Sequence, residues 1–263
     1  MSRIDRQGRW RVALATLACL TAGAADLRAE TFAGEYVVSY LGLPIARSTF
    51  STTIEGNRYS VEGSVSSAGI ASIISSVKGK STASGTFTHD AVRPRAFRME
   101  YSEGKRRQMT AIRFRDDRVV STENDPPLKK RGKDWVKLRP EDLVGATDPL
   151  SAGLVRASSP DEVCGRTLKL YDGEFRLDVR LQPVSDPPQV EGYGDVVLCR
   201  AKPKPVAGYR KGRRALDYLE NKSRIMIAFA PLATTGFYAP VYATVGTQIG
   251  TVTVRATHMA RPG

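Results

Sequence analysis

Histidine and cysteine are scarce in this chain, which has 2 His and 3 Cys among 263 residues. Neither His89 nor His258 has a Gly-x-Ser-x-Gly partner, and no Cys-x-x-Cys occurs. The spacing therefore gives no support to a serine-hydrolase triad, a dithiol redox site or a zinc site. We expect no catalytic residues, no metal and no cofactor, although carboxylates brought together only by the fold would escape this reasoning.

Long apolar runs are absent after residue 29, where no stretch approaches the ~18 apolar residues of a membrane-spanning helix. The N-terminus is different, because four arginines within the first eleven residues precede an apolar, Ala-rich run over residues 12–25. This pattern is typical of a secretory signal peptide. We predict a signal peptide over 1–29, cleaved after Ala29, and a single periplasmic domain over 30–263. Cleavage after Ala25, a membrane anchor and lipid attachment at Cys19 are the alternatives.

Removal of the leader leaves one pair of cysteines, Cys164 and Cys199. An even pair in an oxidising compartment predicts a disulfide. Cys164 opens a hairpin and Cys199 lies in the next strand-like run, so the bridge would tie that strand back to the hairpin. Closing the loop adds roughly 3–4 kcal/mol in the chain-entropy model.

Acidic residues are fewer than basic ones, with 27 Asp and Glu against 40 Lys and Arg, a formal charge of +13. Loss of five Arg and two Asp with residues 1–29 lowers the charge to +10. An exported basic protein meets anionic lipids, polysaccharides or wall polymers rather than nucleic acid, which we do not expect as a partner. Plain solvation of a β surface is the alternative explanation of the charge.

Apolar and polar residues alternate along most of the chain, in ten or more short runs separated by turn signals. The spacing predicts a mainly β, closed or nearly closed antiparallel meander. Aromatic residues make up 8% of the sequence, which is thin for the two girdles of an outer-membrane barrel.

The clearest hairpin covers residues 163–182. Asp172-Gly173 predicts a two-residue type I′ turn that pairs Tyr171 with Glu174. One face of this hairpin is then nearly all apolar, and the other carries charged side chains, which we expect to face solvent: Lys169, Arg176, Asp178 and Arg180.

Two segments have helical spacing instead. Ile70, Ile73, Ile74 and Val77 form one stripe of a predicted helix that ends at Gly79. The second helix starts at Asp148 as N-cap with Pro149 in its first turn. Its predicted inward stripe is Leu150, Leu154 and Val155. Core packing is the expectation for both, with a lid over a lipid pocket as the alternative for the first.

Two basic segments are candidate ligand-binding sites. The first is a Pro-bearing segment, predicted to be a mobile loop, with Lys129, Lys130, Arg131 and Lys133. The second runs from Arg200 to Arg214 and ends in Arg210, Lys211, Arg213 and Arg214. Both could contact phosphate or carboxylate groups, for which Arg offers bidentate contacts. A solvated linker is the alternative.

The order of these elements resembles the exported bacterial family of domain of unknown function 3108. The resemblance rests on the DPLSAGLVRA and CGRTLKLYDGEFRLDVRL segments and on the closing APVYATVGTQIGTVTVRATHM. It implies an envelope protein with an open antiparallel barrel or β-spiral and one or two short helices. It implies no catalytic residues.

Three functions are compatible with these patterns. We favour a periplasmic, non-enzymatic binding or carrier protein that holds a lipid-like, anionic-headed ligand in its curved sheet. The alternatives are a structural or protein-interaction component of the envelope and an enzyme of unrecognised type.

Overall fold

The computed structural model describes residues 29–88, 91–185, 189–190, 192–232 and 235–260. The predicted signal peptide lies outside the described residues except for Ala29. One antiparallel sheet contains nearly all the strands, in the order β10-β11-β12-β14-β15-β16-β1-β2-β3-β4-β5-β6-β7. β9 pairs with β15, and β8 with β13 forms a separate two-stranded sheet.

The long strands of the first half are β1 (Glu30–Tyr40), β2 (Leu43–Glu55), β3 (Arg58–Ser67), β4 (Val77–Phe87), β5 (Val92–Glu103), β6 (Arg106–Arg115) and β7 (Arg118–Asp125). The second half contains β8 (Trp135–Val136), β9 (Val155–Arg156), β10 (Thr167–Tyr171), β11 (Arg176–Pro183), β12 (Val197–Ala207), β13 (Tyr209–Arg210), β14 (Ile225–Pro231), β15 (Phe237–Thr247) and β16 (Gly250–Ala260). The helices are α1 (Ile70–Ile74), α2 (Arg214–Asn221) and three 3₁₀ turns, η1 (Pro140–Leu143), η2 (Ser151–Gly153) and η3 (Pro160–Glu162).

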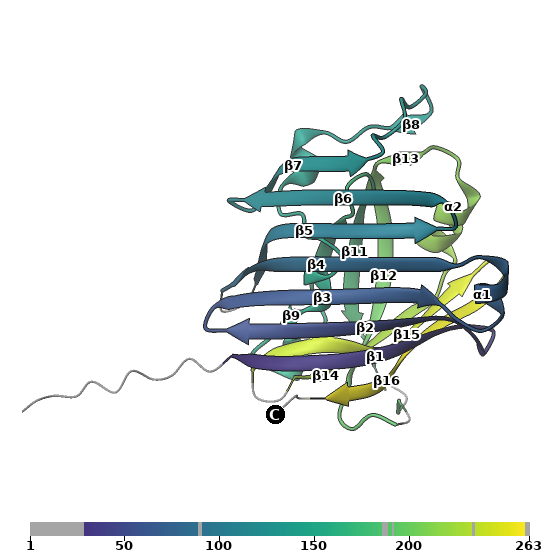
Figure 1. Ribbon diagram of the computed structural model, residues 1–263. Coiled ribbons are helices and arrows are strands. Elements are labelled where there is room, and N and C mark those ends of the chain that lie inside the picture. The colour runs from purple at the N-terminus through teal and green to yellow at the C-terminus, as the bar shows by residue number, and fades with distance from the viewer. Residues whose placement is uncertain (1–28, 89–90, 186–188, 191, 233–234, 261–263) are drawn as a thin grey trace, which may run out of the picture.

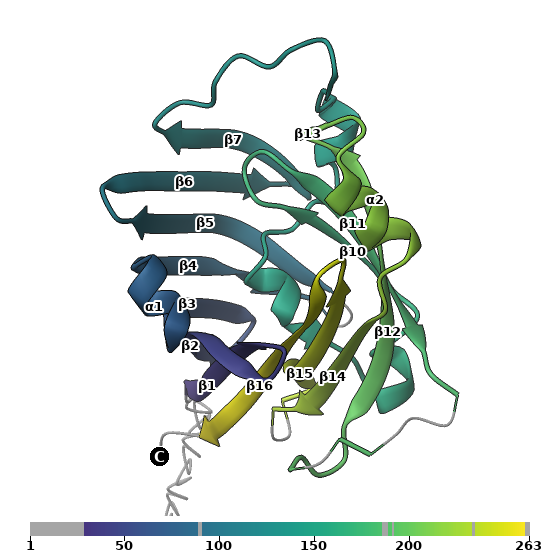
Figure 2. The same cartoon turned by 90° about the vertical axis from the view of Figure 1, so that its right-hand side faces the viewer.

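The sheet is rolled but not closed. Figure 1 shows β1–β7 as a stack with β11 and β12 behind it, and Figure 2 shows the two halves as facing walls. Strand pairing stops at β7 on one side and at β10 on the other. The fold is therefore mainly β, an open antiparallel barrel, as the sequence predicts.

An irregular segment around residues 144–147 fills the gap between the two end strands, β7 and β10. We call the gap and the segment that fills it the seam. Val144 forms a bridge with Arg118 at the start of β7, and Thr147 forms one with Leu170 in β10. The Gly145 N–H donates to the Asp117 carbonyl at 2.7 Å. Two strand edges that would otherwise leave backbone groups unpaired are thus covered by one stretch of chain.

The core lies between the two walls and beside the seam. One buried cluster gathers residues from β1–β6, β10 and β15, with Ile112, Tyr59 and Phe237 among its best-buried members. A second cluster surrounds the two cysteines, and a third contains Tyr36 and Val241. Alternation explains this arrangement, because every second residue of a strand faces inward.

The hairpin prediction was right about most of its apolar face and wrong about the turn. Tyr171 pairs with Arg176 and not with Glu174, so the loop has four residues, and the Asp172 carboxylate accepts the N–H groups of Glu174 and Phe175. The register moves by two residues, which preserves the faces. Arg176 is 3% exposed, so the prediction that it faces solvent was wrong. The seam covers that face near the loop.

Both predicted helices are shorter than predicted. α1 ends at Ile74, Val77 already starts β4, and Gly79 lies inside that strand. Ile73 is 84% exposed, so it does not belong to an inward stripe, while the side chains of Ile70 and Ile74 lie outside the described part of the structure. A run of only five helical residues cannot compete with strand pairing on both sides.

The second helix is a single 3₁₀ turn, η2, whose N-cap is Leu150 and not Asp148, but Asp148 makes the hydrogen bonds expected of a cap. The Asp148 carboxylate accepts the N–H groups of Leu150 and Ser151 at 3.0 and 2.8 Å. Leu154 and Val155 are buried, as predicted, and Val155 belongs to β9.

The second basic segment is not a linker. Residues 200–207 continue β12, where Arg200, Lys202 and Lys204 face solvent and alternate with buried side chains. Pro203 and Pro205 lie beyond the end of β14, where β12 has a neighbour on one side only, as strand prolines require. Residues 214–221 form α2, a helix that the sequence analysis did not predict. No described helix is long and apolar enough to cross a membrane.

Candidate ligand-binding pocket and basic rim

An apolar pocket of about 360 Å³ lies inside the rolled sheet. Its walls come from β14, β15, β16, β1, β2 and β3, which are consecutive in the strand order, and from the segment around η2. Side chains from both walls meet there, for example Phe50 and Val254, and Leu150 and Leu154 cover one side. No described residue that lines the pocket is charged. Its size lies within the range of small-molecule sites, and its lining suits an apolar ligand.

Polar groups in the pocket wall are few and mostly satisfied. The Tyr36 hydroxyl donates to the Pro240 carbonyl at 2.9 Å, and burial, with the nearby Tyr193 as a second cause, raises the pKa of Tyr36 to about 12. The hydroxyl therefore stays neutral at physiological pH. Tyr242 also lines the pocket, and the Arg255 guanidinium lies 5.4 Å from the centroid of its ring. The wall can hold an apolar chain, and it has no group placed for acid or base chemistry.

The basic segments lie elsewhere, on one end of the rolled sheet that we call the basic rim. It consists of the β1–β2 turn, α1, the β5–β6 turn, residues 126–134, the β10–β11 loop, residues 208–224 with β13 and α2, and the β15–β16 turn. These connections share an end because antiparallel strands reverse direction at alternate ends of the sheet, and β7 runs back to this end before residues 126–134. In Figure 1 the β1–β2, β5–β6 and β15–β16 turns, α1 and α2 lie on the right-hand side of the molecule, which faces the viewer in Figure 2.

The fold brings the two predicted basic segments together. β8 and β13 pair Trp135 with Arg210 and Val136 with Tyr209. The Arg210 side chain forms an ion pair with Asp134, which lowers the pKa of that carboxyl group. The 129–133 stretch and the 210–214 stretch therefore belong to one surface.

Not every cation of the first segment is available to a ligand. Arg131 forms an ion pair with Glu174, and its guanidinium lies 4.4 Å from the Trp135 ring centroid. Lys129, Lys130 and Lys133 are exposed, and within the described chain they form no ion pair. Sequence reasoning could not separate Arg131 from its neighbours, because Glu174 is 43 residues away.

A polar hollow of about 760 Å³ lies between β12 and the C-terminal end of α2. Arg200, Lys202, Lys222 and Arg224 surround it together with Glu220. This hollow is where the second basic segment could bind an anion. Lys211, Arg213 and Arg214 precede or open α2 and do not line it.

The pocket and the basic segments do not form one site. None of the candidate residues Lys129, Lys130, Arg131, Lys133, Arg210, Lys211, Arg213 and Arg214 lines the pocket. The pocket lies along the middle of the strand order, whereas residues 129–133 follow β7 at the seam. The expectation that basic loops surround the head group of a pocket ligand does not match this arrangement. The pocket residues were missed because apolar lining cannot be distinguished from apolar core in a sequence.

His258 is the one histidine among the described residues. His258 is exposed on β16 and pairs across the sheet with Glu35, while His89 lies outside the described residues. In the described part of the chain, no three His, Cys, Asp or Glu side chains gather as metal ligands.

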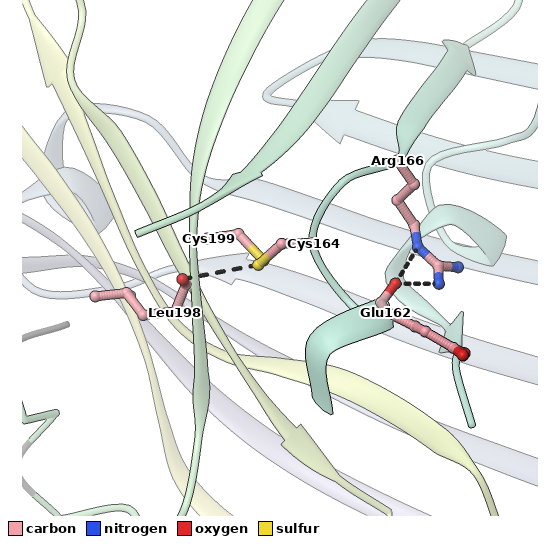
Figure 3. The surroundings of a disulfide bond; sticks show 5 residues. All are labelled: Glu162, Cys164, Arg166, Leu198 and Cys199. Atoms are coloured by element: carbon pink, nitrogen blue, oxygen red, sulfur yellow. Dashed lines mark hydrogen bonds between the residues drawn. A yellow bond between two sulfur atoms is a disulfide. The ribbon is translucent and has the colours of Figure 1, made fainter. Parts of the chain in front are cut away.

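Cys164 and Cys199 are joined by a disulfide with an S–S distance of 2.02 Å. Figure 3 shows the bridge: Cys164 lies just before β10 and Cys199 in β12. Both cysteines are buried. The turn before Cys164 is held by Arg166, whose guanidinium donates to the Glu162 and Arg156 carbonyls. The bridge thus ties the edge of the seam to the third strand of the sheet.

These features define a class of protein: an open antiparallel barrel with one disulfide and an uncharged internal pocket. The chain belongs to the family described as protein of unknown function (DUF3108), whose pattern matches residues 35–257. No curated protein matches the chain. Among solved structures it is similar to a beta-barrel-like protein of domain of unknown function DUF1849 from Brucella abortus. That match has 8% identity and a TM-score of 0.48, and covers 90% of this chain and 99% of the other.

Proposed function

We propose that this protein is a periplasmic, non-enzymatic envelope protein that binds or carries an amphiphile, with the apolar part of the ligand in the internal pocket. The observation that carries the proposal is the uncharged lining of a pocket of about 360 Å³ inside the sheet. Burial of an acyl chain there would contribute about 0.8 kcal/mol per methylene. A leader-like N-terminus and a disulfide support an oxidising, exported location.

The position of the cations indicates which part of the ligand supplies the affinity. Since no charged side chain lines the pocket, the affinity should come from the chain of the ligand and not from its head group. The basic rim would then act at longer range, on association rate and on partner choice.

Native mass spectrometry of protein purified from the periplasm, followed by lipid extraction, tests this function. We expect a copurifying lipid-like ligand that is lost on extraction with solvent. Recovery of the protein only from the cytoplasm with residues 1–29 intact would contradict the location.

A second experiment separates the pocket from the surface charge. Replacement of Lys129, Lys130 and Lys133 by Gln should leave the dissociation rate of a fluorescent acyl probe unchanged and lower its salt-dependent association rate, so that the affinity falls only by the same small factor. Arg131 is left in place because its ion pair with Glu174 supports the loop. If the wild-type protein takes up no probe and carries no lipid, the carrier function fails, and a protein-interaction role in the envelope is the alternative.

A further inference from the structure

Four large aliphatic side chains are exposed on the basic rim. Leu41 lies in the β1–β2 turn, Leu43 at the start of β2, Ile73 in α1 and Ile249 in the β15–β16 turn, with exposed fractions of 63, 56, 84 and 77%. Among the described residues these are the four most exposed of the large apolar side chains. Exposed aliphatic residues that gather at one end of a protein usually mark an interaction surface.

Backbone contacts hold these turns side by side. The Leu41 N–H donates to the Thr251 carbonyl at 3.1 Å, and the Tyr40 hydroxyl donates to the Ile249 carbonyl. The connection into α1 is attached to β2, because the Ala68 N–H donates to the Ile45 carbonyl at 2.9 Å. The four aliphatic residues therefore belong to neighbouring turns at one end of the rolled sheet, and this end faces the viewer in Figure 2.

Leu41 occupies a position that its side chain does not favour. Leu41 and Gly42 have φ values of 49° and 83°, so both central residues of this two-residue turn are left-handed. Such turns favour Asn, Asp or Gly at the first position, and the β6–β7 turn at the opposite end of the sheet uses Asp116 and Asp117. A leucine at positive φ, 63% exposed, adds strain without adding core packing. Its apolar side chain is then best explained by a contact outside the chain.

Cations flank the aliphatic tips on both sides. Lys105, Arg106 and Arg107 lie at the β5–β6 turn, where the Gly104 N–H donates to the Ser76 carbonyl just after α1. On the other side are three cations at the start of α2: Lys211, Arg213 and Arg214. The Gln248 side chain donates to the Arg214 carbonyl at 3.2 Å, which places α2 beside the Ile249 turn. These six cations form no ion pair within the described chain.

We propose that the basic rim docks onto an anionic lipid surface, with Leu41, Leu43, Ile73 and Ile249 inserted among the acyl chains and the flanking cations against the head groups. Separate aliphatic tips with a surrounding ring of Lys and Arg match the layered chemistry of a lipid interface. The charge complementarity selects anionic over neutral lipid. This docking does not depend on the internal pocket, because no rim tip lines it.

Vesicle sedimentation tests the docking with the mature protein. We expect binding to vesicles that contain phosphatidylglycerol, with about tenfold weaker partitioning to pure phosphatidylcholine vesicles or at high salt. Replacement of Arg213 and Arg214 by Gln should weaken the binding, whereas the same change at Arg113 and Arg115, on the opposite half of β6, should not. Equal losses from both pairs would show a nonspecific charge effect and overturn the proposal.

The apolar tips have a sharper test. Leu41→Asn together with Ile249→Ser should weaken binding by about tenfold or more, since each aliphatic chain loses its burial. Leu41→Asn relieves the strained turn, so its unfolding midpoint should be equal to or above that of the wild-type protein, which separates docking from folding. Val120→Ser, at an aliphatic residue that is 52% exposed near the other end of the sheet, is the matched control. Wild-type protein that binds no anionic vesicle, or a Val120 variant that loses as much binding, would overturn the proposal.

Discussion

The seam and the pocket are the two places where the rolled sheet departs from a filled, regular barrel. They differ in what is interrupted: strand pairing at the seam, and side-chain packing at the pocket. At the pocket, consecutive strands from β14 to β3 are paired by backbone hydrogen bonds, and the side chains leave an uncharged space. At the seam, direct pairing between β10 and β7 is interrupted, and backbone groups of the intervening segment together with buried side chains supply the hydrogen bonds.

The polar groups of the seam are buried and connected. Arg176 donates from Nε to the Asp142 carbonyl at 2.7 Å, and the Tyr59 hydroxyl donates to Ser151 at 2.7 Å. Across the gap, the hydroxyl groups of Thr122 in β7 and Tyr171 in β10 lie 3.2 Å apart. Buried charge in this protein thus has a structural role at the seam, and the region without charge is the one suited to bind a ligand.

The largest effect on the seam is expected from the disulfide, which anchors the chain just before the edge strand β10. Cys164→Ala together with Cys199→Ala opens a loop of 35 residues and should lower the free energy of unfolding by about 3–4 kcal/mol. Urea denaturation of the double variant and of reduced wild-type protein should give the same loss. Wild-type stability that does not respond to reductant would contradict this account.

Arg176 should be the next most important residue. Its Nη1 atom forms an ion pair with an Asp178 carboxylate oxygen at 2.7 Å, and its side chain is 3% exposed. Arg176→Met removes the bond to the Asp142 carbonyl, and we expect a loss of about 2 kcal/mol, because the partly exposed Asp178 can regain water. Arg180 lies on the same face of β11 as Arg176, but its side chain is exposed. Arg180→Met should therefore lower the free energy of unfolding little in the same denaturation series.

A smaller, pH-dependent effect is expected at Asp148, which is fully buried and has one unpartnered carboxylate oxygen. Burial raises its pKa, against the opposing hydrogen bonds from Ser151 and Leu150. A raised folded-state pKa stabilises the protein most below the unfolded value of 3.8, and this contribution disappears as pH rises through the folded value.

Asp148→Asn keeps the cap without the charge and should leave stability at neutral pH equal or higher, whereas Asp148→Ala should lose about 1 kcal/mol. Unfolding curves at acidic and neutral pH compare the two variants with the wild-type protein. If the Asn variant is as unstable as the Ala variant, the ionised carboxylate is needed after all.

Sequence patterns predicted the sheet because alternation, turn residues and the cysteine count are local or countable signals. They predicted the Asp148 cap for the same reason. The burial of Arg176 could not be predicted, because an alternating strand normally presents every second side chain to water. The Arg176 side chain is buried only because the seam covers it. The two basic segments were visible as composition, but their common position depends on pairing between β8 and β13, 73 residues apart from Val136 to Tyr209.

The pocket was out of reach for a different reason. In the sequence, Ile227, Ala243 and Val254 are indistinguishable from ordinary strand residues that face a core. In the structure they form one row across β14, β15 and β16 and line the pocket. Whether such a row meets another wall or leaves a space depends on the curvature of the whole sheet. A one-dimensional pattern does not contain that curvature.

Titration of a fluorescent acyl probe into matched variants tests most directly whether the uncharged pocket is the binding site. Ala243→Leu adds volume inside the pocket, and we expect at least about tenfold weaker binding, because the added side chain displaces several buried methylenes of the ligand. Ala96→Leu makes the same change on an exposed position of β5 and should bind the probe like the wild-type protein. Both variants must retain the wild-type unfolding transition. Equal affinity for the wild-type protein and the Ala243 variant would contradict the central claim.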